Sequence, residues 1–340
     1  MKAAPSIAPL EAPYTLRACA VPYETLAERH PAYGKFGQDV GRTRLIEVPG
    51  PHGGATVMAK CEWENPEGSV KDRVAYALLG SALEEHGDRP LSELKVLEYS
   101  GGNLSRALSA LCAELGIRSR YVLSSASPRS LLDTLEARGA EVDLVDKEKG
   151  FLEVVRRALR TAEEDPGWHL LYQHRNPANL FFHERTTGAE IVAQTRERKV
   201  AAWVASIGTG GTLIGVLRAL RRRDPAVRAV GVTPSELPYA SEQPPNGLPK
   251  YAGSGGMGYG IRQPFVTLHD DEIEHHTVSH SRCLELMAEF FAATGIRIGT
   301  SAAANWSTAR EVAASLPPSD TVVTVLPDAG TPEEWARIGR

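Results

Sequence analysis

One lysine stands where a side-chain amine could act as a nucleophile. Lys71 lies in the segment W-E-N-P-E-G-S-V-K-D-R, residues 63–73. The apolar run Ala55–Cys61 predicts a buried strand before it, and Val70–His86 has the pattern of a helix. Lys71 would then occupy the first helical turn, where the helix dipole disfavours a positive charge. A deprotonated lysine attacks carbonyl groups; the alternative is a solvent-exposed lysine in an ordinary strand–turn–helix.

A second segment has the composition of a phosphate-binding loop. Residues 208–212 read G-T-G-G-T, between a predicted strand, Ala201–Ile207, and a predicted helix, Gly211–Arg222. Backbone N–H groups at a helix start can surround a phosphate. The loop is not a Walker loop, because no lysine follows the glycines, and Leu213 stands where G-x-G-x-x-G has its third glycine. The alternative is a tight structural turn.

Three further loops place polar groups at predicted strand ends or helix starts. Ser100–Asn103 reads S-G-G-N, and its glycines let the backbone approach a ligand closely. Asn103 could instead be a simple N-cap, and so could Ser301 at the start of another predicted helix. Residues 173–179, Q-H-R-N-P-A-N, carry more polar groups than a turn needs.

The elements that must position these loops alternate between strand and helix from Arg42 onward. Strands are predicted at 55–61, 95–99, 120–124, 141–145, 169–172, 201–207, 227–232 and 321–326, and helices at 70–86, 103–115, 130–138, 151–164, 178–196, 211–222, 279–294 and 301–314. This order predicts an α/β fold with mostly parallel sheet and helices on both faces. Ligands in such folds bind at the carboxyl ends of strands. Residues 1–40 are predicted to be an irregular extension that wraps the body or a partner subunit, and 236–264 a long irregular loop.

Composition narrows the class of protein. The chain has 340 residues, which suits two α/β domains, and 42% hydrophobic with 24% charged residues is typical of a globular protein. A net charge of −4 provides no basic field for nucleic acid. The four cysteines are scattered, which predicts neither a disulfide framework nor a zinc site. Without a membrane-length apolar stretch or a signal-like block, the sequence is interpreted as that of a soluble cytoplasmic protein.

A phosphate loop, an amine and several hydroxyl and amide donors together suit pyridoxal 5′-phosphate. The sequence resembles the fold type II pyridoxal-phosphate enzymes that replace β-substituents, the cysteine synthase and cystathionine β-synthase family. The matching segments occur in family order from about residue 41 to residue 330. They are N-P-E-G-S-V-K-D-R (65–73), S-G-G-N (100–103), Q-H-R-N-P-A-N…H-E-R-T-T-G-A-E-I (173–191), G-T-G-G-T (208–212), G-V-T-P (231–234), G-S-G-G-M-G-Y-G (253–260) and G-I-R-I-G-T-S-A-A-A (295–304).

This resemblance implies two doubly wound, mostly parallel sheet domains with the cofactor in the cleft between them. Residues 63–178 would form one domain, with a mobile subdomain, and residues 41–62 plus 179–330 the other. Lys71 would form the Schiff base, Asn103 would bond the 3′ oxygen of the cofactor, and Ser301 would meet its pyridine nitrogen. The phosphate would be held by Gly208, Thr209, Gly210, Gly211 and Thr212. The substrate would be bound by Ser100, Gly101, Gly102, Leu104, Gln173 and Gly258. A homodimer is also implied.

The implied reaction is β-replacement on an activated L-serine, of the O-acetylserine or O-phosphoserine type, through an α-aminoacrylate intermediate. Lys71 would remove the α-proton as general base. A serine at position 301, unlike an aspartate, does not keep the pyridine nitrogen protonated, which favours prompt loss of the β-substituent. The nucleophile could be sulfide, an amine or another group of a specialised amino-acid pathway.

One loop departs from the family pattern T-S-G-N-T, whose donors grip the α-carboxylate. This chain has Gly101 and Leu104 at two of those positions, and each lost donor is worth roughly 1 kcal/mol when buried. We therefore expect O-acetylserine with sulfide not to be the best substrate pair.

Two other functions compete with β-replacement. The first is β-elimination, as in a serine or threonine dehydratase or a cysteine desulfhydrase. Dehydratases of this fold usually have a glycine run without threonines in the phosphate loop, so G-T-G-G-T disfavours that function. The second is a non-catalytic regulatory paralogue, which the presence of Lys71, Asn103 and Ser301 disfavours.

Overall fold

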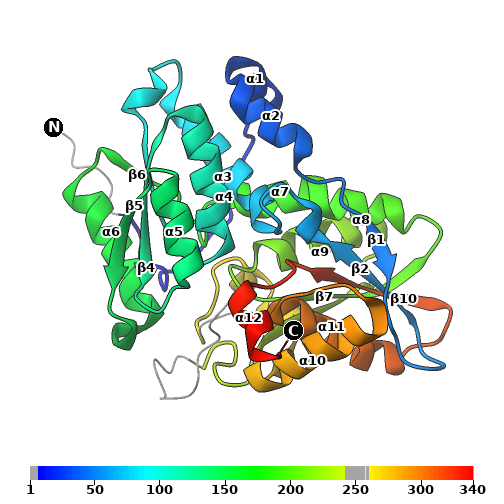
Figure 1. Ribbon diagram of the computed structural model, residues 1–340. Coiled ribbons are helices and arrows are strands. Elements are labelled where there is room, and N and C mark those ends of the chain that lie inside the picture. Colours follow the sequence, from blue (N-terminus) through cyan, green and yellow to red (C-terminus); the bar gives the residue numbers. More distant parts are fainter. Residues whose placement is uncertain (1–6, 242–256, 258–259, 340) are drawn as a thin grey trace.

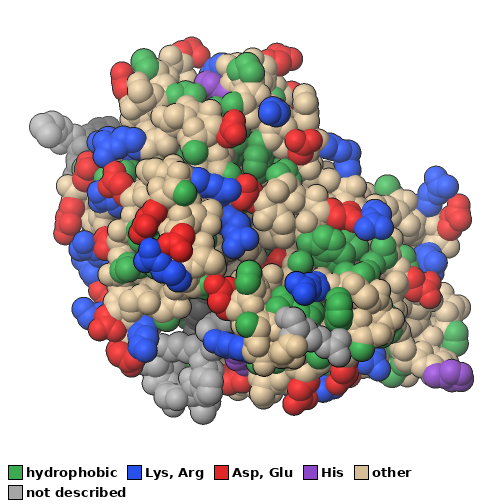
Figure 2. Space-filling model, in the orientation of Figure 1, with side chains coloured by type: hydrophobic (Ala, Val, Ile, Leu, Met, Phe, Trp, Pro, Cys, Tyr) green, Lys and Arg blue, Asp and Glu red, His purple; other side chains and the backbone are tan. Residues whose placement is uncertain are grey.

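The protein is built around two β-sheets, as a computed structural model shows (Figure 1). The structure describes residues 7–241, 257 and 260–339. One sheet has four strands and the other has six. On the face drawn in Figure 2, basic and acidic side chains are interspersed, so no single sign of charge dominates that face.

The smaller sheet is entirely parallel, in the order β5-β4-β3-β6. Its strands are β3 (Lys95–Tyr99), β4 (Arg118–Ser124), β5 (Glu141–Val145) and β6 (Trp168–Leu170). Its helices are α3 (Lys71–His86), α4 (Asn103–Leu115), α5 (Arg129–Ala137) and α6 (Gly150–Glu164). Helix α6 packs on one side of the sheet, and α4 and α5 lie on the other (Figure 1).

The larger sheet has the order β1-β2-β10-β7-β8-β9, with only β1 antiparallel to its neighbour. Its strands are β1 (Leu45–Glu47), β2 (Thr56–Cys61), β7 (Lys199–Ser206), β8 (Arg228–Pro234), β9 (Ile273–Val278) and β10 (Asp320–Leu326). Its helices are α7 (Pro177–His183), α8 (Ala189–Gln194), α9 (Gly211–Arg223), α10 (His280–Thr294) and α11 (Thr300–Ala314). A last helix, α12 (Pro332–Arg337), follows β10.

The inner strands of the larger sheet, β2, β10, β7 and β8, are largely apolar on both faces, because helices cover both. In β7, Ala202 and Val204 pack in the core that includes α10 and α11. Trp203 and Ala205, which alternate with them, pack in the core that includes α9. Two buried faces explain why these strands appear in the sequence as continuous apolar runs. The predicted α/β fold class is confirmed, whereas the predicted domain boundaries stay a proposal.

The first 40 residues are not wholly irregular, so that part of the prediction is wrong. Two helices, α1 (Tyr23–Arg29) and α2 (Pro31–Asp39), pack against α3. The Tyr33 ring stacks on that of Tyr76, with ring centroids 4.1 Å apart, and the Tyr33 hydroxyl donates to the Tyr76 carbonyl at 2.7 Å. These helices therefore depend on tertiary contacts that local sequence patterns do not show.

The predicted helix 178–196 is also interrupted. A π-helical turn, Glu184–Gly188, separates α7 from α8. Helix α9 lies very close here: a Cβ atom added at Gly188 would come within 2.5 Å of the Ala219 Cβ.

The sequence analysis also missed β1, β9 and α12. The predicted loop 236–264 lies largely outside the described residues. Within the described part of the chain, no helix is long and apolar enough to cross a membrane.

Candidate functional site

A cavity of about 810 Å³ opens at the carboxyl ends of β3, β7 and β10. It collects most of the predicted site residues from both halves of the molecule. Those lining it are Lys71, Ser100, Gly101, Gly102, Asn103, Leu104, Gln173, Gly208, Thr209, Gly210, Thr212 and Ser301. Gly211 is not among the lining residues, and Gly258 lies outside the described part of the chain.

Lys71 is the first residue of α3 and is partly exposed on the cavity wall. The start of this helix is fixed to the end of β10, because the Val70 N–H donates to the Pro327 carbonyl at 2.8 Å. Desolvation lowers the pKa of the Lys71 amine, and the nearby Asp328 carboxylate partly opposes that shift. A lowered pKa raises the fraction of free amine at neutral pH, which is the form that attacks a carbonyl.

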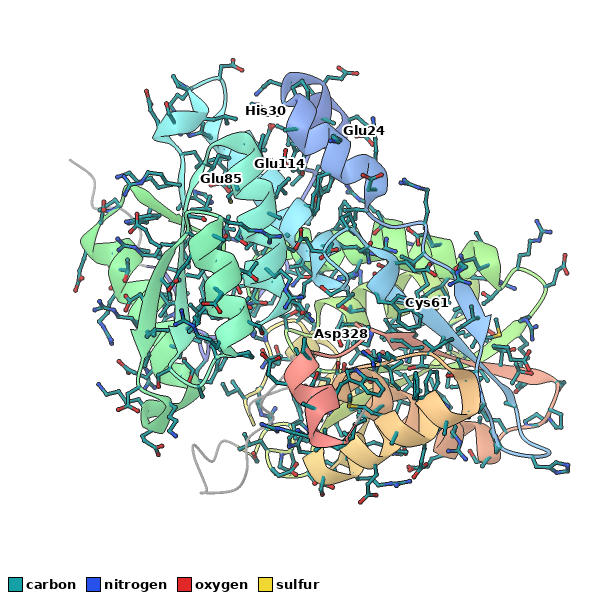
Figure 3. The ribbon with its side chains drawn as sticks, viewed as in Figure 1. Glu24, His30, Cys61, Glu85, Glu114 and Asp328 are labelled. Atoms are coloured by element: carbon teal, nitrogen blue, oxygen red, sulfur yellow. The ribbon has the colours of Figure 1, made fainter. Side chains whose placement is uncertain are left out.

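Asn103 is held by an aspartate that the sequence analysis missed. The Asn103 Nδ2 donates to Asp328 Oδ2 at 2.8 Å, and the Gly330 N–H donates to Asp328 Oδ1 at 2.9 Å. Figure 3 shows Asp328 where the two halves of the molecule meet. Asn103 is the first residue of α4 and Gly102 its N-cap, so the N-cap alternative for Asn103 is wrong. Because the amide is oriented by Asp328, its oxygen and second N–H are left for a ligand.

The loop before α9 has the shape of an anion cradle. Gly210 has the left-handed φ of +83°, and a Cβ there would come within 2.5 Å of Val266 Cγ2. At Gly211 a Cβ would come within 2.4 Å of Asn179 Oδ1. The Thr209 hydroxyl accepts hydrogen bonds from Gly211 N and Asn179 Nδ2, each at 3.1 Å. Its own proton therefore remains available to donate to a phosphate oxygen.

A buried histidine orients the other threonine of this loop. Thr212 Oγ1 lies 3.1 Å from His183 Nε2, and His183 Nδ1 lies 2.9 Å from Thr187 Oγ1. Burial, with the positive charge of Arg73, lowers the pKa of His183 to about 3, so the ring is neutral at physiological pH. The Thr212 hydroxyl is thus held at the helix start by an uncharged partner.

Ser301 is not the N-cap of its helix. The N-cap of α11 is Gly299, which makes no side-chain cap bond, and Ser301 is the second residue of the helix. Its side chain is 3% exposed, lines the cavity, and has no hydrogen-bond partner among the described residues. A lone hydroxyl on the cavity wall can bond an uncharged pyridine nitrogen, so this position fits pyridoxal phosphate, as Lys71 and the glycine loop do.

The predicted substrate loop offers few side-chain donors. Gly101 is exposed, and a Cβ there would come within 2.7 Å of Ser127 Oγ. Leu104 borders the cavity but is 0% exposed, because its side chain packs in the apolar core that includes α3 and α4, and it therefore offers a substrate no accessible surface. The remaining donors here are the Ser100 hydroxyl and backbone N–H groups at the start of α4.

Gln173 has its amide hydrogens engaged within the protein. The Gln173 Nε2 donates to the Tyr99 carbonyl at 2.8 Å and to Glu98 Oε1 at 3.3 Å. Only the amide oxygen is then left, and it repels a carboxylate. Gln173 as a substrate carboxylate ligand therefore stays a proposal that requires its amide to change partners.

The sequence analysis missed an N-terminal wall of the cavity, residues 10–14. Arg175 holds this segment: its guanidinium donates to the carbonyls of Ala12 at 2.7 Å and Pro13 at 2.9 Å, and to those of Pro9 and Leu10. The excess of polar groups in residues 173–179 was the only signal of this role in the sequence. The analysis also missed Tyr99 and His174, which line the cavity.

The comparisons with known proteins agree with this geometry. The family model described as "Pyridoxal-phosphate dependent enzyme" matches residues 37–328. The chain is similar to a cysteine synthase of Staphylococcus aureus (strain Mu50 / ATCC 700699), 31% identical over 295 residues, covering 86% of this chain and 93% of the relative.

Two solved structures are also similar. One is O-ureido-L-serine synthase, with a TM-score of 0.77 and 28% identity, covering 88% of this chain and 92% of that one. Another is an O-acetylserine-dependent cystathionine β-synthase of Helicobacter pylori, with a TM-score of 0.75 and 26% identity, covering 86% and 94%. The predicted cofactor and the predicted class of β-substituting enzyme are confirmed. The chain belongs to the family of pyridoxal-phosphate-dependent enzymes.

Proposed function

We propose that the protein catalyses β-replacement on an O-substituted L-serine, with O-acetyl-L-serine as the first donor to test. The observation that supports this most is that one cavity is lined by Lys71, Asn103 and Ser301 together with Gly208, Thr209, Gly210 and Thr212 of the glycine loop. The names of the similar proteins, a cysteine synthase and an O-ureido-L-serine synthase, support the same chemistry.

Bound pyridoxal phosphate supplies an electron sink that acidifies the α-hydrogen of an amino acid and so permits a β-substituent to depart. In our proposal the Lys71 amine attaches the cofactor and later takes the α-proton. The hydroxyls of Thr209 and Thr212 and the N–H groups of the loop 208–212 hold its phosphate. Asn103 and Ser301 orient its ring.

The substrate carboxylate is proposed to bind at the start of α4. The Ser100 hydroxyl and the backbone N–H groups of Gly101, Gly102 and Asn103 would bond it, and the N-terminal end of the helix dipole favours its negative charge. Gly258, predicted from the resemblance as a further substrate contact, remains part of this proposal. We also propose a cytoplasmic homodimer, and the mass of the purified protein in size-exclusion chromatography tests the dimer.

An assay that quantifies both products of the reaction tests the proposed function. Purified holoenzyme is mixed with O-acetyl-L-serine and either sulfide, L-homocysteine or ammonia, and the amino-acid product and released acetate are quantified. We expect one acetate for each new β-substituted amino acid, with at least one nucleophile better than sulfide. If pyruvate and ammonia form at the rate of acetate whichever nucleophile is present, the enzyme eliminates and does not replace. If no donor is consumed, a non-catalytic paralogue is the better interpretation.

A further inference from the structure

The cavity wall contains a histidine that the functions assigned so far do not use. His174 is 3% exposed and lines the cavity beside Gln173. Its ring stacks on Tyr99 with centroids 5.4 Å apart and an angle of 8°, and the Phe151 ring lies 5.8 Å away. Rings on two sides restrict the imidazole to one orientation.

Hydrogen bonding fixes the tautomer of this histidine. His174 Nδ1 lies 2.8 Å from the Tyr99 hydroxyl, whose oxygen also accepts a hydrogen bond from the His174 backbone N–H, so that the hydroxyl proton is still available for Nδ1. Burial raises the pKa of Tyr99 well above its usual value, so the phenol keeps its proton. A buried hydroxyl that did not donate to Nδ1 would leave that proton unsatisfied, which is costly. Tyr99 therefore donates to Nδ1, and the ring proton of a neutral His174 lies on Nε2.

The imidazole stays neutral and its Nε2 is available. Burial, and then the positive charge of Lys71, lower the pKa of His174 to about 3. No hydrogen-bond partner of Nε2 is found among the described residues. His174 thus presents one uncharged N–H on the wall of a cavity where Gly101 and Leu104 offer no side-chain donor and the Gln173 N–H groups are engaged.

We propose that the His174 Nε2–H donates to the departing oxygen of the O-substituted L-serine, with Tyr99 as its positioning residue. This inference rests on the proposed function. Lys71 accepts the Cα proton, the Cβ–O bond breaks with its electron pair on the oxygen, and acetate leaves as an anion. The α-carboxylate is directed to the backbone N–H groups of α4, whereas the departing oxygen is one carbon from the site at which Lys71 acts. A fixed neutral donor there stabilises charge as it develops.

A pair of substrates that differ in the leaving atom tests this role. O-acetyl-L-serine loses a carboxylate oxygen, whereas 3-chloro-L-alanine loses chloride, a weak hydrogen-bond acceptor. His174→Phe is expected to lower kcat/KM for O-acetyl-L-serine by about 10- to 100-fold, the loss of one donor to a developing charge, and for 3-chloro-L-alanine by less than about threefold. His174→Gln retains an N–H donor and should recover part of the loss, and Tyr99→Phe should fall between wild type and His174→Phe.

The ratio of the two kcat/KM values distinguishes the loss of a hydrogen bond to the departing oxygen from a general disturbance of the cavity, which would affect both substrates equally. Equal losses on both substrates, in variants that keep the cofactor absorbance and Tm of the wild type, overturn this role for His174. Failure of His174→Phe to fold does not prevent the test, because His174→Gln and Tyr99→Phe must still change the ratio. A wild-type holoenzyme inactive on both substrates overturns the proposed function and this inference with it, whereas activity with an unchanged ratio in every variant overturns this inference alone.

Discussion

At the scale of single residues, the site depends on groups whose partners leave one atom free for a ligand. Ser301 has its hydroxyl on the cavity wall, Thr209 accepts two hydrogen bonds and keeps its proton, and Asn103 is oriented by Asp328. Lys71 could be singled out from its own segment because it lies in a glycine-bounded turn, whereas the roles of Asn103 and Ser301 were implied only by the family resemblance, since each residue by itself also suited a helix N-cap. Asp328 could not be predicted, since only the fold brings it to Asn103, 225 residues away.

Ser301→Asp should change the reaction more than cofactor binding. A carboxylate at this position would keep a proton on the pyridine nitrogen, so the substrate carbanion would last longer and the β-substituent would leave more slowly. We expect acetate release from O-acetyl-L-serine to fall at least about tenfold, with new absorbance at long wavelength in stopped-flow spectra. Ser301→Ala is the control and should lack that absorbance. If Ser301→Asp released acetate at the wild-type rate, Ser301 would have no role at the pyridine nitrogen of the cofactor.

At the scale of elements, a buried ionic network joins β2, α3 and α8. Arg73 donates to both oxygens of Glu62, at 2.7 and 2.9 Å, and to both oxygens of Glu190, while Lys60 bonds Glu190 at 2.7 Å. Burial opposes ionisation of Glu62, but the Arg73 charge and hydrogen bonds outweigh it and hold the pKa of that carboxyl at about 2. The network fixes the start of α3, and with it Lys71, to the larger sheet.

Glu62→Gln should destabilise the protein in a pH-dependent way. The substitution leaves the buried Arg73 guanidinium without the negative charge of Glu62, which lowers the free energy of unfolding by about 3–5 kcal/mol near neutral pH. The folded-state pKa lies below its ordinary value of 4.5, so the stabilisation by Glu62 is complete above that pH and is lost as pH falls towards about 2. Urea denaturation should therefore show the wild-type and variant stabilities converging below pH 4.5. Glu64→Gln, the partner of the exposed Arg44, is the control and should cost less than about 1 kcal/mol at every pH.

The segment of residues 10–14 depends on one arginine for its place on the cavity wall. Arg175→Ala removes three hydrogen bonds to the backbone of this segment and one to the adjoining Pro9 carbonyl. We therefore expect the segment to detach, protease to cleave within residues 1–20, and KM for the donor to rise about three- to tenfold. Arg185→Ala, which removes a bond to the Cys19 carbonyl farther along the extension, is the matched control. Unchanged KM together with new proteolysis would show that the segment is only a surface covering.

The loop Ser100–Asn103 makes a prediction of its own. Gly101→Ser adds a hydroxyl where the family pattern has one, and among the described residues the atom nearest to the added Cβ is Ser127 Oγ, the end of a side chain that can rotate away. We expect kcat/KM for O-acetyl-L-serine to rise, by about tenfold if roughly 1.4 kcal/mol of transition-state binding is restored. Gly101→Ala is the control for lost backbone freedom. An equal gain in both variants, or none in either, would mean that this hydroxyl does not limit donor binding.

At the scale of the whole molecule, two sheets meet at one cavity, and most of this arrangement could be predicted. Strand–helix alternation and apolar runs indicate parallel sheets covered on both faces. Helices α1 and α2 could not be predicted, because they are held by rings such as Tyr33 and Tyr76, 43 residues apart. The pairing of Tyr99 with His174 spans 75 residues and was missed for the same reason. Local sequence patterns thus predict most helices and strands, whereas contacts between residues distant in the sequence, such as Tyr99 and His174, can be found only in the folded structure.

The most direct test of this account is to find which amine holds the cofactor. Holoenzyme is reduced with borohydride, which fixes pyridoxal phosphate to its lysine, then digested, and the labelled peptide is sequenced by mass spectrometry. We predict one label, on Lys71, and none in Lys71→Ala treated in parallel. Lys60, engaged with Glu190 and the Thr43 carbonyl, and Lys95, over the Trp168 ring, are the matched internal controls. Label on Lys60 or Lys95 in place of Lys71 would contradict the assignment of the cavity as the active site.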